Sequence, residues 1–366
     1  MLISLLEKED EFMSTFEETI EEIDRIRSIQ EPDVNNKKNK VFSKEWYALK
    51  EKYWKKPSAV WPLLQIIPFG AALAVNFLLP TVQEVEVFPY RVFLVMVMAF
   101  LGGSYILSFF NKKIKLIINH KAQFYFALGL ILIAWDVLTA KSNTLPLPFF
   151  PSLAQIIQVM VEDYQTLLIS TFYSLRLLAL GFAIGTALGL ITGVLVGWYK
   201  QWGYWFFPFL KVIGIVPAIA WIGIVMFIFS SFYTEVFLIV LCVWFPVAFM
   251  TSTGIVNIQK SYFEAAKTLG ANEWFLIFKV ALPAAMPSIF VGIYTAISVS
   301  FATLVVSEMI GAVAGLGWYI NWAKSWSDYG KVFASIIVMF IVFSLVMGLI
   351  FKIRDRILIW QKGLLK

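Results

Sequence analysis

Cysteine, histidine and charged residues are scarce in this sequence of 366 residues. Cys242 is the only cysteine and lies in an apolar run, so a disulfide within the chain and a thiolate metal site are both excluded. The one histidine, His120, stands beside lysines, which argues against a histidine-based triad or metal site. Charged residues make up 15% of the chain and hydrophobic residues 60%, whereas soluble domains carry about 25% charged residues. A soluble globule could not bury that apolar excess, so we predict an all-α polytopic membrane protein.

A phosphate-binding loop of the form G-x-x-x-x-G-K-[ST] is also missing. The only Gly-Lys pair, Gly330-Lys331, is followed by valine. This chain therefore cannot hydrolyse ATP by that route, and we expect it to be neither an enzyme nor a carrier of a bound cofactor or metal.

Long apolar segments dominate what is present. Spanning the bilayer core takes about 20 predominantly apolar residues. Eight segments approach or exceed that length: 58–80, 88–110, 122–140, 166–197, 205–230, 235–256, 283–306 and 332–351. The fourth is too long for a straight span, so we expect part of it to tilt, kink or lie at the membrane surface.

The basic residues orient these spans. If the N-terminus lies inside, 24 of the 30 lysines and arginines fall in inside segments and three in outside segments. We therefore expect both termini in the cytoplasm, and the net charge of +6 to face cytoplasm and anionic lipid rather than nucleic acid.

Composition also suggests a division of the chain. Residues 1–57 are polar, and 11–28 have helical spacing that fits a surface-bound amphipathic helix or a solvated tail. Residues 58–121 form two spans and a basic loop, and residues 122–366 hold the remaining spans. We predict that the spans near 58–80 and 88–110 form a peripheral hairpin.

One loop on the predicted cytoplasmic side, residues 257–282, contains residues that favour two short helices separated by a turn. "YFEAAKTL" (262–269) consists of good helix formers, Gly270 can adopt the positive φ that ends a helix, and Asn272 can cap the next one. Pro283 is expected at the start of the following span. On these grounds alone the loop is either a well-capped connection or a docking surface.

The spacing of this loop resembles the EAA signature of permease subunits of bacterial ABC importers. The residues that match are Glu264, Ala265, Ala266, Gly270, Leu282 and Pro283, while Val280 stands where isoleucine is usual. The segments "LPLPFFPSLAQIIQVM" (145–160), "IVPAIAW" (215–221) and "SEMIGAVAGLGWYI" (307–320) are similar to the nitrate, sulfonate, taurine and bicarbonate subfamily.

The resemblance implies a MetI-like permease core of about six transmembrane helices, preceded here by the extra hairpin. It implies a bacterial inner-membrane subunit that couples through residues 257–282 to a separate ATPase, which uses ATP and magnesium. Further implied partners are a second permease copy, as a homodimer, an extracytoplasmic solute-binding protein and membrane lipid. The implied solute is a small organic or inorganic anion, but the sequence does not show which anion it is.

Ionisable residues near the membrane are functional candidates by default. Glu308 ends the seventh span beside a glycine-rich stretch that the resemblance places near an outer gate, although a water-exposed carboxylate is the alternative. Arg176 either attracts an anionic solute, pairs with a carboxylate or reaches the surface. Asp136 and Lys211 are expected near span ends, with their side chains reaching the surface. Five glycines at every fourth position are expected to form a helix-packing face: Gly181, Gly185, Gly189, Gly193 and Gly197.

Two other classes of function remain open. A secondary transporter or channel would work without an ATPase, and it predicts inverted repeats with charges at mid-membrane. A membrane-embedded enzyme would need clustered His, Asp or Glu. The scattered carboxylates favour neither class.

Overall fold

The computed structural model describes residues 60–83, 85–110, 112–142 and 144–359, without the side chains of residues 112–117, 120, 213 and 215. The chain divides into two compact units, Met1–Trp61 and Pro62–Lys366. Only the last two residues of the first unit are described, so the predicted polar region 1–57 lies outside the described residues, including its helix at 11–28.

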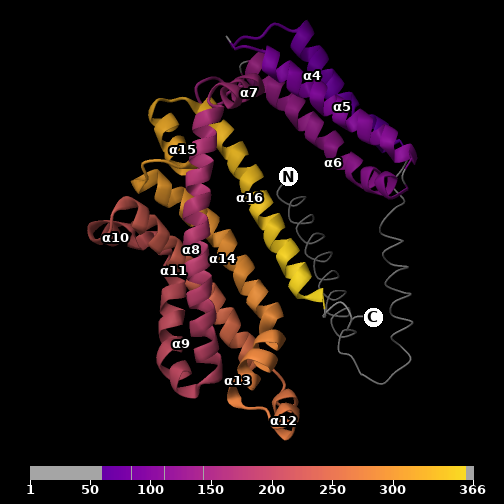
Figure 1. Ribbon diagram of the computed structural model, residues 1–366. Coiled ribbons are helices and arrows are strands. Elements are labelled where there is room, and N and C mark those ends of the chain that lie inside the picture. Colours follow the sequence, from indigo (N-terminus) through magenta and orange to yellow (C-terminus); the bar gives the residue numbers. More distant parts are fainter. Residues whose placement is uncertain (1–59, 84, 111, 143, 360–366) are drawn as a thin grey trace, which may run out of the picture. The chain divides into compact units, whose positions relative to one another are not determined.

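Every regular element in the described ranges is helical, as predicted. Two segments, η1 and η3, are wide π-helical turns, and η2 is a narrow 3₁₀ turn. In chain order the elements are α3 (Trp61–Leu64), α4 (Ile67–Leu78), α5 (Phe88–Phe110), α6 (Lys112–Asp136), η1 (Val137–Lys141), α7 (Leu153–Glu162), α8 (Tyr164–Trp198), α9 (Lys200–Ile215), η2 (Ala218–Trp221), α10 (Ile222–Ile228), α11 (Ser231–Val256), α12 (Lys260–Thr268), α13 (Glu273–Phe275), η3 (Leu276–Ala281), α14 (Leu282–Gly311), α15 (Leu316–Ser325) and α16 (Tyr329–Ile357) (Figure 1).

Seven helices in the described part are long and apolar enough to cross a membrane, and they coincide with seven of the eight predicted spans. The exception is the segment at 205–230, which is divided into α9, η2 and α10. Its helix ends before Val216 and Pro217, whose backbones are extended. Proline has no N–H and disfavours helix in the residue before it, so this sequence breaks the span locally.

The predicted glycine face packs α8 against α11. A Cβ atom at Gly185 would lie 2.7 Å from Cβ of Val243, and one at Gly189 would lie 2.7 Å from Cβ of Val247. Gly181 and Gly193 meet Ile239 and Thr251 in the same way. Partners stay 58 residues apart along both helices, so α8 and α11 run parallel. The segment between them must therefore return across the bundle, and α9, η2 and α10 form an eighth, broken crossing.

α14 runs antiparallel to α11, since Gly254 approaches Ser288 while Gly292 approaches Met250. Helical structure is continuous from Glu273 to Gly311, a stretch of 39 residues that begins with α13 and η3. Figure 1 shows α12 and α13 at one end of α14 and α15 at the other. We call these the inner end and the outer end, after the predicted orientation.

The three helices α4, α5 and α6 pack on one another. At Gly129 of α6, a Cβ atom would lie 2.6 Å from Cβ of Pro68, so glycine permits the close approach to α4. The predicted basic loop at 111–121 is helical from Lys112, because no proline or glycine interrupts it. The boundary predicted at residue 121 therefore falls inside α6.

Candidate functional site

The loop at the inner end is centred on α12, which buries none of its residues. Glu264 and Ala265 are exposed, and Ala266 is half-buried. Gly270 has φ +83°, as its sequence context predicted. The Ala271 amide donates to the carbonyl of Ala266 at 3.1 Å, and the Gly270 amide to that of Lys267 at 2.9 Å. These two bonds form a Schellman motif, which ends α12 and fixes the direction of the following chain.

A second set of contacts holds the loop against α8. Asn272 accepts a hydrogen bond from the Phe275 amide at 2.9 Å, which confirms the predicted cap. Trp198, at the end of α8, donates its indole N–H to Glu273 at 2.9 Å. The same ring meets Phe263 edge-on, with centroids 5.5 Å apart. The loop is therefore positioned by specific contacts rather than left as a free connection.

The loop reaches α14 through a continuous helix, which differs from the start predicted at Pro283. Leu282 is half-buried and Pro283 exposed, and the wide turn η3 directly precedes them. Proline cannot donate to the carbonyl four residues earlier, and a π-helical turn is a common way for a helix to absorb such a defect.

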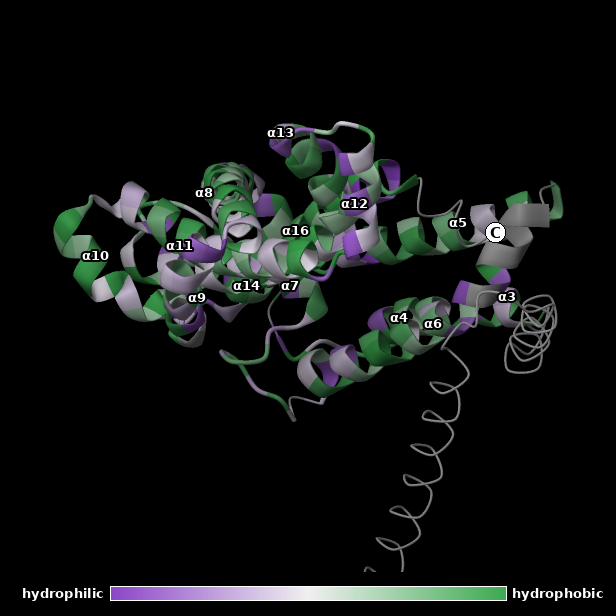
Figure 2. Cartoon of the chain, turned by 90° about the horizontal axis from the view of Figure 1, so that it is seen from below, coloured by the Kyte–Doolittle hydropathy of each residue, from purple (hydrophilic) through white to green (hydrophobic). Residues whose placement is uncertain are grey.

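Large apolar side chains are exposed around this polar loop. Leu269 is 88% exposed, Trp274 70% and Tyr262 60%. Figure 2 shows hydrophilic residues on α12 and α13, in contrast to the mostly hydrophobic α5 and α10. Exposed apolar groups within a polar surface are typical of surfaces that contact another protein or a membrane. We name Tyr262, Leu269 and Trp274 the docking patch.

The outer end carries a buried carboxylate. Glu308 is 1% exposed, so the water-exposed alternative is wrong. Its Oε1 accepts a hydrogen bond from the Ser174 hydroxyl at 2.6 Å, and its Oε2 accepts one from the Gly317 amide at 2.7 Å. Ser174 in turn accepts the Leu316 amide at 2.9 Å. The three bonds join α8, α14 and the N-terminus of α15, and we name them the outer latch.

Two glycines make the outer latch possible. Gly315 has φ +124°, and a Cβ atom there would lie 2.5 Å from the Glu308 carboxylate. At Gly317 a Cβ atom would meet Cβ of Glu308 at 2.8 Å. The carboxylate can therefore sit directly on the first amides of α15, where the helix dipole favours negative charge.

A second buried carboxyl, Glu235, was not singled out from the sequence. It is 1% exposed and lies in the first turns of α11. The Ser231 hydroxyl contacts both Glu235 Oε1, at 2.9 Å, and the carbonyl of Gly311. The signal available in the sequence was a lone glutamate at the head of an apolar run.

The other predicted candidates have different surroundings. Arg176 is exposed, with its guanidinium carbon 4.9 Å from the centre of the Phe232 ring, and no carboxylate in the described part of the chain forms an ion pair with it. Asp136 is 1% exposed, so the expectation that it reaches the surface is wrong. The turn η1 continues the helix beyond Asp136, which keeps this residue inside.

Comparison with known proteins finds similarity over part of the chain. Residues 185–359 match the family described as "Binding-protein-dependent transport system inner membrane component". A putative ABC transporter permease of Methanocaldococcus jannaschii is 25% identical over 43% of this chain and 61% of its own length. The nitrate import permease NrtB of Leptolyngbya laminosa is 27% identical over 50% of this chain and 66% of its own. The glycine betaine/carnitine/choline permease OpuCD of Bacillus subtilis is 27% identical over 35% of this chain and 52% of its own length.

The chain thus spans less than two thirds of each of these relatives. Among solved structures, the inward-facing MetNI methionine ABC transporter aligns with a TM-score of 0.46 and 17% identity, over 54% of this chain and 98% of the MetNI chain. Over residues 185–359, slightly less than half of its length, this chain is therefore similar to binding-protein-dependent transport system inner membrane components.

Proposed function

We propose that this chain is the membrane-spanning permease subunit of an ATP-driven importer for a small anionic solute. The family match over residues 185–359 and the relatives named as permeases support a role in transport. In this proposal a separate ATPase subunit binds ATP and magnesium, and an extracytoplasmic binding protein delivers the solute. A second copy of this chain completes the pathway in the bacterial inner membrane, and both termini lie in the cytoplasm.

The observation that carries the proposal is the loop at the inner end. It combines an exposed apolar surface, the docking patch, with a backbone held by the Gly270 turn and the Trp198 contacts. A rigid, exposed and partly apolar surface outside the bilayer favours a protein partner over a solvated connection. We assign it to the ATPase subunit, with Glu264, Ala265 and Ala266 on the helix that docks.

The loop is mechanically linked to the outer latch. A continuous helical stretch runs from Glu273, beside the docking patch, to Gly311, just beyond Glu308. A rigid helix transmits a displacement along its length, and packed interfaces switch between discrete arrangements rather than deform smoothly. Movement of the loop by the ATPase would therefore shift Glu308 relative to Ser174 and open or close the outer end.

The test is to replace Trp274 by alanine and Leu269 by aspartate in the full-length chain expressed with its ATPase partner. Trp326→Ala is the matched control, because Trp326 is 74% exposed but lies at the outer end. We expect both docking-patch variants to reach the membrane at normal levels, to lose ATPase co-purification and to lose ATP-dependent uptake. The control should retain both.

A secondary transporter or channel gives a different result. In that case no ATPase co-purifies with the parent chain, and solute flux persists when ATP is withheld. Either finding would overturn the proposed function.

A further inference from the structure

Lys211 lies well along the broken crossing formed by α9, η2 and α10, beside the middle part of α11. It follows the start of α9 by 11 residues, or about 16 Å at 1.5 Å per residue, which is roughly half of a 30 Å bilayer core. Its neighbours on α9 agree. Phe207 stacks on Phe249, and a Cβ atom at Gly214 would meet the ring of Phe245, halfway along α11. α9 begins at Lys200, five residues before the start predicted for this segment, and the helix breaks after Ile215.

With the inner boundary of the bilayer core at the start of α9, the ammonium group is out of reach of water at the membrane surface. An extended lysine side chain covers about 6 Å, whereas either surface of the core is roughly 15 Å away. Among the described residues no carboxylate pairs with Lys211, and its Nζ atom lies 5.0 Å from the centre of the Phe207 ring. A charged side chain at mid-membrane with no counter-ion needs a water-filled cavity or a charged ligand.

The nearby break in the span points to such a cavity. Val216 and Pro217 have extended backbones one turn beyond Lys211, and Pro217 is exposed on the chain. Irregular backbone at membrane depth is tolerated where protein covers it or where it lines a water-filled space. Transport proteins commonly bind solutes at such interrupted helices.

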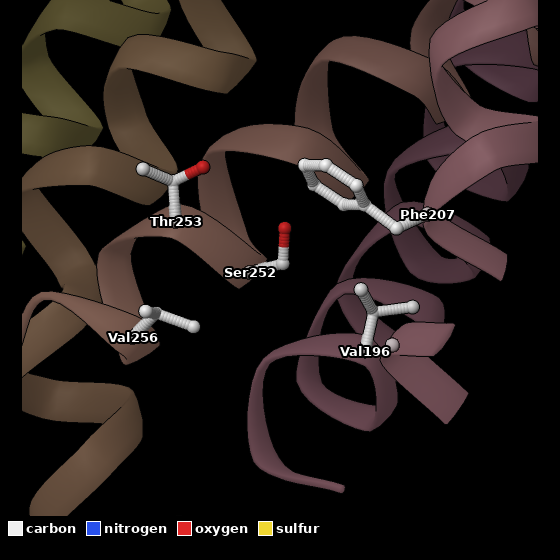
Figure 3. Close-up of a pocket in the computed structure, with 6 residues that line it drawn as sticks. Val196, Phe207, Ser252, Thr253 and Val256 are labelled. Carbon is white, nitrogen blue, oxygen red and sulfur yellow. The ribbon is translucent and has the colours of Figure 1, made fainter. Parts of the chain in front are cut away.

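The space on the inner side of Lys211 is a pocket of about 300 Å³ between α8, α9 and α11 (Figure 3). Phe207, Val196 and Val256 supply its apolar walls. Ser252 and Thr253 supply hydroxyls, but both donate to the carbonyl of Phe249 in their own helix. The Phe207 ring lines this pocket and also contacts the Lys211 ammonium group. The ammonium group is therefore the positively charged hydrogen-bond donor next to the pocket.

We propose that Lys211 binds the anionic group of the solute at mid-membrane, next to the break between α9 and η2. This inference deepens the proposed function and rests on it. One ammonium beside apolar and aromatic walls selects for negative charge but recognises little else. The site accepts a small carboxylate, sulfonate or inorganic monoanion and repels quaternary ammonium solutes, although one of the relatives is named for them.

The first experiment measures water access in the full-length chain assembled with its ATPase in vesicles. The natural cysteine is replaced (Cys242→Ser), and Lys211→Cys is treated with membrane-impermeant methanethiosulfonate reagents, one anionic and one cationic. Phe340→Cys is the matched control, because Phe340 is 73% exposed at similar depth on the apolar helix α16. We expect Lys211→Cys to react with both reagents at least ten times faster than the control. Equal, negligible reactivity at the two positions would overturn the proposal.

The second experiment measures the charge. A reporter cysteine at Thr253→Cys, in the pocket, is modified with Lys211 present and after Lys211→Gln. With Lys211 present, we expect the ratio of anionic to cationic modification rates to be about five times the ratio measured for a free thiol. This preference for the anionic reagent should vanish in Lys211→Gln and persist in Lys211→Arg. Sodium nitrate and methanesulfonate, but not choline, should slow modification only when the positive charge is present.

Identical reagent ratios in the lysine and glutamine backgrounds would refute the role of Lys211. ATPase co-purification is measured on the same samples. If the ATPase is bound and the charge effect is absent, the inference alone fails, whereas absence of any bound ATPase from the parent chain contradicts the proposed function itself.

Discussion

Replacing Ser174 by alanine should loosen the outer latch without disturbing the rest of the bundle. The hydroxyl donates to Glu308 at 2.6 Å and accepts the Leu316 amide at 2.9 Å, and all of these groups are buried. Its removal deletes one hydrogen bond to a carboxyl group and leaves a buried N–H without a partner. Such losses cost about 1.5–3 and 1–3 kcal/mol respectively, so the closed outer end should lose roughly 2.5–6 kcal/mol.

Hydrogen exchange of the purified full-length chain, followed by mass spectrometry, measures this change locally. A loss of roughly 2.5–6 kcal/mol corresponds to exchange about 70-fold to more than ten-thousand-fold faster at the amides of residues 315–319, if these amides exchange through opening of the latch. Residues 273–281, at the inner end, should be unaffected. Glu308→Gln should give a smaller effect, because its amide oxygen still accepts the Gly317 N–H.

Ser298→Ala is the matched control, since the Ser298 hydroxyl is exposed and bonds only to the Tyr294 carbonyl of its own helix. It should change exchange little anywhere. If Ser174→Ala and Ser298→Ala behave alike at residues 315–319, the hydrogen bonds of the outer latch do not hold α15, and the reasoning is refuted.

Three further predictions concern packing, the turn and pH. Gly189→Ala should destabilise the chain by about 1–3 kcal/mol in thermal unfolding, because its Cβ atom would meet Val247. Gly348→Ala should be neutral or stabilising, because a Cβ atom there has no atom within 4 Å. Equal effects of the two substitutions would contradict the packing face. Gly270→Val should destabilise the turn by about 1–2 kcal/mol through its positive φ alone, because a Cβ atom there meets nothing within 4 Å in this chain. Gly270→Asn should destabilise the turn less. Equal ATPase co-purification by the parent and both variants would argue against a role for the turn. Burial raises the pKa of Asp163, but hydrogen bonds from Lys331, at 2.9 Å, and Tyr319, at 2.8 Å, outweigh it and lower the pKa below its ordinary value. The resulting stability is present above the unfolded value near pH 4 and is lost as the pH falls further. The melting temperature of the parent should therefore fall more between pH 5 and 3 than that of Asp163→Asn, and equal falls would contradict the contribution of this ion pair.

Several features of the fold follow from local chemistry and were predictable. Hydropathy located the spans, and the every-fourth-residue glycines located the face of α8 that packs on α11. Gly270 and Asn272 were expected to end one helix and begin the next, and both do so. Each of these predictions depends on residues within a few turns of one another, so no knowledge of distant partners was needed.

The sequence by itself determined that this protein is a bundle of apolar helices with a rigid polar loop at one end, because length, hydropathy, turn residues and caps act locally. Tertiary structure decided the surroundings of its charged groups. Glu308 is buried because Ser174, 134 residues away, and the amides of α15 meet it. Lys211 lies along a crossing of the bundle because α8 and α11 run parallel, so the broken segment between them has to return. The environment of a charge depends on partners far along the chain, which no local pattern encodes.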